Sequence, residues 1–219
     1  ISGTGKMKSW KFLNNLRADW FEQKDNILTI EIQNGVKNIG SSAFYRCTNV
    51  STIQIPNSVE NIESYSFHEC SNLNNINIPN SVILIDNLAF GDCTNLTNIA
   101  IPNSVTTIGG QAFYNCNKLS SIAISEGVTS IGEECFKGCT SLTNIVIPAS
   151  VETINERAFE NCNNLSSIDI KNGVKNIGTQ CFKGCSNLSN IEIPSSVTNI
   201  ESQEYSEFSS ISVDSNNTT

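Results

Sequence analysis

The sequence predicts an α/β repeat solenoid, in which 23-residue units stack side by side and each contacts mainly its two neighbours. Each unit is expected to add one strand to a parallel β-sheet and one short helical or 3-10 turn to the other side. Three patterns indicate this fold: isoleucine pairs two residues apart, a proline or glycine turn after each pair, and a cysteine column. The cysteine column is a set of cysteines that recur at the same position of seven successive units, always 23 residues apart: Cys47, Cys70, Cys93, Cys116, Cys139, Cys162 and Cys185.

Composition favours one elongated domain. The 219 residues carry one continuous repeat, and a hydrophobic content of 38% suits a narrow solenoid with a large surface. The 13 basic and 21 acidic side chains give a net charge of −8, so neither nucleic acid nor an anionic lipid surface is an expected partner. No run of 18 apolar residues occurs, and membrane insertion is therefore not predicted.

Residues 1–27 precede the repeats and hold both tryptophans, Trp10 and Trp20. Apolar residues recur at roughly helical spacing between positions 6 and 22. Terminal units of a solenoid must cover the open end of the first coil. We therefore expect 1–27 to be an N-terminal capping segment, with an interaction helix as the alternative.

The repeats are expected to run from residue 28 to residue 200, as seven to eight units. Eight isoleucine pairs predict eight short parallel strands, from Ile30/Ile32 to Ile191/Ile193. Proline ends five of these strands, because it cannot donate a hydrogen bond to a ladder. In the other three units the proline is absent, and the serine two positions later becomes a glycine that we expect at positive φ: Gly35, Gly127 and Gly173.

After the turn, each unit repeats valine and isoleucine, then a small residue, phenylalanine and the cysteine. We expect the small residue, the phenylalanine and the cysteine to form the helical or 3-10 turn. No unit should fold alone, because ordering 23 residues costs more free energy than burying about six apolar side chains provides.

Beyond residue 200 the pattern weakens, although Tyr205 still falls in the phenylalanine column and Phe208 in the cysteine column. An exposed parallel edge invites aggregation, so the last full unit needs a cover. We expect 201–219 to be either a degenerate C-terminal unit or a truncated continuation of the repeats.

The string L-x-x-I-x-I-P-x-S-V-x-x-I-G-x-x-A-F-x-x-C, read from Leu96 to Cys116, resembles the BspA-type leucine-rich repeat, also called the Treponema pallidum type. The resemblance covers residues 28–200 and implies an arc-shaped right-handed solenoid with its parallel sheet on the concave side. Proteins of this family are typically on the cell surface or secreted and are linked to adhesion, which implies the same location here. A cytoplasmic location is the alternative, because abundant unpaired cysteines fit a reducing compartment.

The nine cysteines are interpreted as buried packing residues with free thiols. Neighbouring thiols of the column should lie about 5 Å apart but in parallel orientation, which is unsuited to a disulfide. Cys135 and Cys181 lie outside the column and two repeats apart, too far to form a metal site together; a local disulfide stays the alternative. His68, the single histidine, is two residues from Cys70, whose column offers no cleft for a nucleophile. We expect no metal, no cofactor and no enzyme activity.

Two rows of side chains are expected to point outward from the concave sheet, because residues alternate between the two faces of a strand. They are short and neutral in the middle of the chain and acidic towards its C-terminal end, which suits a protruding protein or glycan partner. An ordinary solvated sheet face is the alternative. The candidate binding residues are Asn75, Asn77, Asn98, Ala100, Ser121, Ala123, Asn144, Val146, Ser167, Asp169, Asn190 and Glu192.

A second candidate surface consists of Ile83, Leu84 and Leu88, which occupy positions that are polar in most other units. Exposed apolar patches are typical of self-association surfaces. Local repacking of these side chains is the alternative, and the sequence fixes no oligomeric state.

These observations predict a non-enzymatic protein-binding or adhesion module that presents its concave sheet to a protein at a cell surface. The prediction rests on the fold resemblance, because no nucleophile or acid–base pair interrupts the repeat. One alternative is an intracellular interaction scaffold that uses the same face. Another is a carbohydrate-binding module that uses the asparagine and serine rows.

Overall fold

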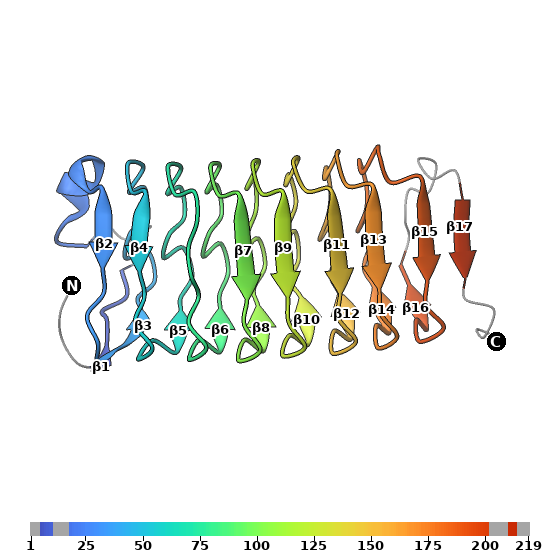
Figure 1. The fold of residues 1–219 in the computed structure, drawn as a ribbon, viewed down its shortest axis with the longest axis horizontal. Helices are drawn as coiled ribbons and strands as arrows, with labels where there is room; N and C mark the ends of the chain where they lie inside the picture. The colour runs from blue at the N-terminus through green and yellow to red at the C-terminus, as the bar shows by residue number, and fades with distance from the viewer. Residues whose placement is uncertain (1–4, 11–17, 202–209, 214–219) are drawn as a thin grey trace.

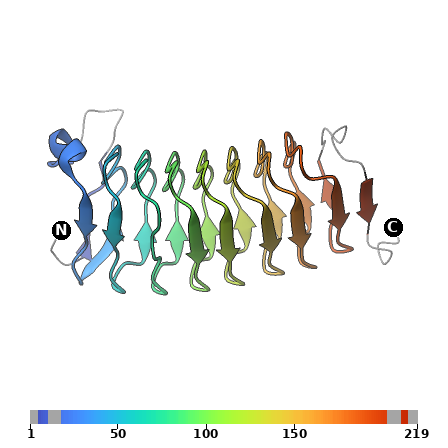
Figure 2. The ribbon, with the colours of Figure 1, turned by 45° about the horizontal axis from the view of Figure 1, so that its top comes forward.

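The computed structural model describes residues 5–10, 18–201 and 210–213. Within these ranges the chain forms an elongated stack of coils, with β1 at one end and β17 at the other (Figure 1). Two columns of short strands run along the stack, as Figures 1 and 2 show. All strand pairings are parallel, and partners in the repeats are mostly one 23-residue unit apart, as in Asn144↔Ser167. The predicted parallel solenoid is confirmed.

The first column contains seven of the eight strands that the isoleucine pairs predict, together with β17, which they did not predict. It is divided into the two-stranded sheets β2–β4, β7–β9, β11–β13 and β15–β17. The unit of Ile76 and Ile78 forms no strand in the described structure and makes a single bridge, from Asn75 to Asn98. We name the exposed side of this column the strand face; its concavity stays a prediction. The strands are β2 (Thr29–Glu31), β4 (Thr52–Gln54), β7 (Asn98–Ile101), β9 (Ser121–Ile124), β11 (Asn144–Ile147), β13 (Ser167–Ile170), β15 (Asn190–Ile193) and β17 (Ser210–Val213).

The second column is one nine-stranded sheet, which the sequence analysis did not anticipate. Apart from β1, it is built by the isoleucine that follows the turn and the residue before it, in strands of mostly two residues. Segments this short carry no period-two pattern, which is why they escaped detection. The strands, in sheet order, are β1 (Gly5–Lys6), β3 (Val36–Ile39), β5 (Asn61–Ile62), β6 (Leu84–Ile85), β8 (Thr107–Ile108), β10 (Ser130–Ile131), β12 (Thr153–Ile154), β14 (Asn176–Ile177) and β16 (Asn199–Ile200).

The expected helical turn is not confirmed, and with it the α part of the predicted α/β class. In the segment of phenylalanine and cysteine, alternate N–H groups bond to the following coil, as from Phe90 to the carbonyl of Ala112. The N–H groups between them bond three residues back, as from Gly91 to Leu88. A helix needs every N–H to bond back along its own segment, so it cannot form here. We name this segment the spine.

The N–H groups of the spine and those beside the second sheet bond to opposite neighbours of the coil. Next to the second sheet, N–H groups bond to the preceding coil instead, as from Ile83 to Glu60 and from Asp86 to Ile62. Each coil is thus bonded to both of its neighbours through separate parts of its backbone. The stack is therefore held together by backbone hydrogen bonds both along the spine and beside the second sheet.

Phenylalanine side chains of successive coils stack into a ladder inside the solenoid. From Phe44 to Phe182, neighbouring ring centroids are 5.3–5.7 Å apart and the rings are 4–16° from parallel. The leucine, valine, isoleucine and cysteine columns are buried around them. One contiguous core therefore runs the length of the repeats, and each coil contributes one layer to it.

The N-terminal segment continues the aromatic ladder beyond the first coil. Trp20 stacks on Phe44 with centroids 5.6 Å apart, and its indole N–H donates to the carbonyl of Ala43 at 2.8 Å. Trp10 is buried and packs edge-on against Trp20 at 5.1 Å. Of the stretch with roughly helical spacing, residues 6–22, Lys6 belongs to β1 and Phe21 begins the 3-10 helix η2 (Phe21–Asn26), while residues 11–17 lie outside the described structure. The tryptophan packing supports the capping role that we propose for residues 1–27.

Of the expected C-terminal segment, 201–219, residues 201 and 210–213 are described. β17 pairs in parallel with β15, and its Ser210 lies opposite Asn190, 20 positions earlier (190 to 210) rather than the 23 of the regular units. Tyr205 and Phe208 lie outside the described residues. A shortened unit thus covers β15, which supports the proposal of a degenerate C-terminal unit.

Two of the three glycine turns have the predicted positive φ, 102° at Gly35 and 157° at Gly173, whereas Gly127 does not. The N–H of Gly35 donates to Ser58 Oγ at 2.9 Å, and the N–H of Gly173 donates to Ser196 Oγ at 3.0 Å. Each serine hydroxyl in turn donates to a backbone carbonyl of the coil before it. A glycine turn is therefore stabilised by the serine turn of the following coil.

Replacing Gly173 by alanine is expected to lower the free energy of unfolding by about 2–4 kcal/mol. An added Cβ would overlap the backbone oxygen of Ala149, so the backbone of one coil must move. Urea unfolding followed by circular dichroism measures the loss. The exposed neighbour gives the matched control Asn172→Ala, which should change stability by less than about 0.5 kcal/mol. Equal stabilities of the two variants would contradict this account of the turn.

Candidate functional site

The strand face presents all twelve predicted binding residues to solvent, from Asn75 to Glu192. The isoleucines between and beside them point inward, and most are buried, as Ile99 and Ile145 illustrate with exposed fractions of 4% and 3%. This alternation is the period-two pattern of a strand with one buried face. The prediction of two outward rows therefore matches the geometry, whereas their binding role stays a proposal.

Parallel register aligns these side chains into two rows along the stack. Asn98 lies opposite Ser121 and Ala100 opposite Ala123, while Val146 lies opposite Asp169 in the next sheet. Val146 is 50% exposed, one of the few large apolar side chains at the surface. The alanines and this valine leave the backbone of the strand face accessible to a partner.

Hydroxyl groups orient the asparagines of the first row. The side-chain amide of Asn98 donates to Thr97 Oγ1 at 3.2 Å, and that of Asn144 donates to Thr143 Oγ1 at 3.1 Å. The hydroxyl of Thr97 in turn donates to the carbonyl of Asn74 in the preceding coil at 3.1 Å. The amide row is thus held in a defined orientation rather than being a set of independent polar groups.

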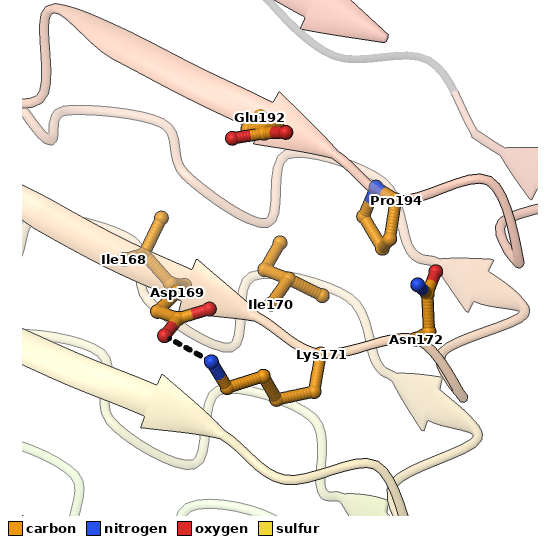
Figure 3. A pocket seen from close by; sticks show the side chains of 7 residues that line it. All are labelled: Ile168, Asp169, Ile170, Lys171, Asn172, Glu192 and Pro194. Carbon is orange, nitrogen blue, oxygen red and sulfur yellow. Dashed lines mark ion pairs between the residues drawn. The ribbon is translucent and has the colours of Figure 1, made fainter. Parts of the chain in front are cut away.

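A pocket of about 300 Å³ opens on the strand face between β13 and β15 (Figure 3). It lies where the first column is divided, because β13 pairs with β11 and β15 with β17. Lys171 Nζ is 2.6 Å from Asp169 Oδ2, and both side chains are about half exposed. Glu192 lines the pocket from β15, while the ion pair lies on the side of β13 away from β15; Asn172 and Pro194 complete the lining. The sequence indicated the two acids but not the pocket or the ion pair.

The interpretation of the cysteines as buried free thiols is confirmed. Six thiols of the column, from Cys70 to Cys185, donate to the phenylalanine carbonyl of the preceding coil, as from Cys93 to Phe67 at 3.2 Å and from Cys139 to Phe113 at 3.2 Å. Burial raises the pKa of the Cys139 thiol to about 12. A thiol with so little thiolate at neutral pH is a poor nucleophile and metal ligand.

His68 and Cys70 have separate partners and do not form a catalytic pair. The Nδ1 of His68 lies 2.8 Å from the carbonyl of Gly91, and its ring stacks on Tyr45 at 5.5 Å. The Cys70 thiol donates to the carbonyl of Phe44 at 3.3 Å. Among the described residues, no three histidine, cysteine or acidic side chains are placed to hold a metal ion.

The predicted apolar patch is dispersed over two parts of the coil. Ile83 is 49% exposed, whereas Leu84 in β6 and Leu88 in the spine are partly buried. Tyr65, which the sequence analysis missed, is 41% exposed and occupies the column of Leu88 one coil earlier. The self-association role of these residues stays a proposal.

A further pocket that the sequence analysis missed has a volume of about 280 Å³ and lies beside the second sheet. Its lining includes three acids, Glu133, Glu156 and Glu201, together with Asn155 and Asn176. The shared column of Glu133 and Glu156 is the signal that could have revealed it. In the described ranges of the chain, no helix has the length and apolarity needed to cross a membrane.

A family model described as the BspA type leucine-rich repeat region, with six copies, matches residues 14–143 and 106–219. A leucine-rich repeat protein from Bacteroides ovatus is 28% identical, with a TM-score of 0.59 over 80% of this chain and 54% of its own. The Treponema pallidum leucine-rich repeat protein is 26% identical, with a TM-score of 0.58 over 75% of this chain and 66% of its own.

A third solved structure, a leucine-rich repeat protein from Eubacterium ventriosum, has a TM-score of 0.63 at 20% identity. The match covers 95% of this chain and 90% of that chain, and it bears on the fold alone. The chain spans about half to two thirds of the length of the first two structures. No curated protein matches the chain.

Proposed function

This chain belongs to the BspA-type leucine-rich repeat family, and on that premise we propose that it is a non-enzymatic module that binds a protein through its strand face. The observation that carries the proposal is the pair of exposed rows, held in parallel register with short side chains over successive coils. An extended face of exposed side chains that spans several coils fits a macromolecule better than a small substrate. Repeat solenoids use such surfaces for binding.

Adhesion at a cell surface is the setting that we propose for this binding. The support is the family resemblance, and an intracellular scaffold is the alternative that nine buried free thiols favour. Protease treatment of intact native cells, followed by detection of the repeat domain, separates the two. Loss of the domain on intact cells supports the surface location, whereas survival until lysis supports the scaffold.

Glycan binding is the second candidate function. The amides of Asn98 and Asn144 are oriented by neighbouring hydroxyls, and such fixed polar groups suit sugar hydroxyls. A glycan array probed with the wild type and with Asn98→Ala/Asn144→Ala tests it. Glycan binding that the double variant loses would favour a carbohydrate partner over a protein partner.

Replacing Ala123 or Val146 by arginine is expected to lower partner capture at least about tenfold, because a long charged side chain would stand in the middle of the flat face. Immobilised wild type and variants are compared for capture of cell-surface and matrix proteins, quantified by mass spectrometry. Thr129→Arg, at an exposed position outside the strand face, is the matched control and should capture normally. Normal capture by the two strand-face variants would exclude this face as the binding surface.

A further inference from the structure

The second row of the strand face changes its chemistry along the stack. Coil by coil, the row reads Ala100, Ala123, Val146, Asp169 and Glu192. Successive members lie about 4.8 Å apart, the spacing of neighbouring strands, so the whole row extends over roughly 19 Å. An apolar half and an acidic half therefore meet between Val146 and Asp169, which lie directly opposite each other in β11 and β13.

The apolar half is flat and accessible. Ala100 and Ala123 lie opposite each other in β7 and β9, both exposed, and Val146 follows at 50% exposure. β9 lies beside β11, although the two belong to different two-stranded sheets. An aliphatic side chain laid over Ala123 and against Val146 would bury apolar surface on both.

The acidic half contains one carboxylate that is paired and one that is not. Lys171 reaches back along β13 and pairs with Asp169 at 2.6 Å (Figure 3). Across residues 18–201, Glu192 has no basic side chain within ion-pair distance. The pocket between β13 and β15 therefore presents a free carboxylate beside one that an internal lysine occupies. The charge of the pocket and the net charge of −8 both complement a cation.

We infer that the partner contributes an extended segment with an aliphatic side chain followed two residues later by a lysine or arginine. The inference rests on the proposed function and assigns the chemistry of the partner at the same face. The aliphatic side chain packs on Ala123 and Val146, and the basic side chain enters the pocket between Asp169 and Glu192. Lys171 acts as an internal competitor for Asp169.

The spacing of an extended chain fits this arrangement. Side chains on one side of a strand recur every two residues, about 6.6 Å apart. Two coils, roughly 9.6 Å, separate the middle of the Ala123–Val146 pair from the middle of the Asp169–Glu192 pair. The length of a lysine or arginine side chain covers the difference, so one segment reaches both halves.

The probe is the peptide acetyl-Gly-Leu-Ser-Arg-Ser-Gly-amide, titrated into isotope-labelled protein at low salt and followed by NMR. We expect a dissociation constant of about 1 mM, with amide shifts concentrated on β11, β13 and β15. Two twin peptides, one with glutamate for arginine and one with serine for leucine, should bind at least about fivefold more weakly. Equal binding of the three peptides, or shifts away from these strands, would overturn the inference.

Three variants test whether each charged side chain of the pocket strengthens or weakens peptide binding. Glu192→Gln is expected to weaken peptide binding about three- to tenfold, whereas Lys171→Met is expected to strengthen it about two- to fivefold by freeing Asp169. Glu152→Gln removes an exposed acid that pairs with Lys175 outside the strand face, and it should leave binding unchanged. Weaker binding by Lys171→Met would mean that the pocket takes an anion, and the inference would be wrong.

Failure of this inference is distinguishable from failure of the proposed function. If Ala123→Arg abolishes partner capture while Glu192→Gln changes neither capture nor peptide binding, the strand face binds a protein but not by the chemistry inferred here. If Ala123→Arg captures the partner normally, the proposed function itself is wrong, and the inference falls with it.

Discussion

Alkaline pH is expected to unfold the protein, with its stability starting to fall near pH 9. Burial raises the pKa of the Cys47 and Cys139 thiols to about 12 and holds those of Cys70 and Cys116 well above their ordinary value of 9.0. The unfolded chain therefore loses these protons first, and between pH 9 and pH 12 it binds fewer protons than the folded chain. Stability that is fully present below pH 9 is lost as the pH rises towards 12.

The size of this effect follows from the number of thiols. Each contributes about 1.4 kcal/mol per pH unit once its unfolded form is ionised. The thiols with a raised pKa together give a slope on the order of 10 kcal/mol per pH unit, which rivals the whole stability of a typical domain. They are Cys47, Cys70, Cys93, Cys116, Cys135, Cys139, Cys162 and Cys181.

Urea unfolding at pH 7, 9 and 10 measures the slope. Tyrosine and lysine also titrate in this range, so the control is the double variant Cys135→Ala/Cys181→Ala, since alanine occupies the same column at Ala112 and Ala158. This variant should fold, and its stability should fall about a quarter less steeply above pH 9 than that of the wild type. Identical slopes would show that thiol ionisation does not drive alkaline unfolding.

Removing one ring of the phenylalanine ladder is expected to cause the second large loss of stability. Phe113→Ala is expected to lower the free energy of unfolding by about 3–5 kcal/mol. The side chain is fully buried and stacks on Phe90 at 5.6 Å and on Phe136 at 5.5 Å, so its removal opens a cavity between two fixed rings. Chemical unfolding measures the loss, and amide hydrogen exchange should locate increased opening in the coils on either side.

The neighbouring Tyr114→Ala is the matched control for this truncation. Tyr114 is only partly buried, so its removal should cost about 1 kcal/mol or less. If Phe113→Ala were no more destabilising than this control, the ladder would not be a main source of stability. A loss of protection spread evenly over all coils would contradict the nearest-neighbour character of the stack.

The columns of the core were predictable from the sequence because a fixed period also fixes the register. Cys93 and Cys116 are one period apart, and stacking neighbouring coils puts both in the same buried column. The alternation around Ile99 and Ile101 likewise determines that Asn98 and Ala100 face outward. The position of a residue in the repeat thus predicted whether it is buried, for most repeat residues, without any knowledge of the path of the backbone.

The path of the backbone within each coil was harder to predict from the sequence. Leu88 has a positive φ of 54°, a conformation that its side chain does not favour, because hydrogen bonds to the next coil determine the backbone there. Local propensity therefore favoured a helical turn where contacts between coils impose another structure. The two-residue strands of the second sheet, such as Thr107–Ile108, are likewise defined by their neighbours rather than by a local pattern.

Only part of the candidate site could be anticipated for the same reason. The exposure of Asp169 and Glu192 follows from their places beside inward-facing isoleucines. The pocket between them depends on where the first column is divided, and the ion pair depends on Lys171 folding back onto its own strand. Neither follows from residue types and spacing alone.

The opposed hydrogen bonding of the spine and of the segment beside the second sheet has an electrostatic consequence. Phe90 donates its N–H towards the C-terminal end of the stack, whereas Ile83 and Asp86 donate theirs towards the N-terminal end. Each peptide unit carries a dipole of about 3.5 D, and in a helix these dipoles add up along the axis. Here the two sets oppose each other within every coil. The two sets of dipoles therefore partly cancel, and added coils build up less partial charge at the ends of the stack than aligned peptide units would.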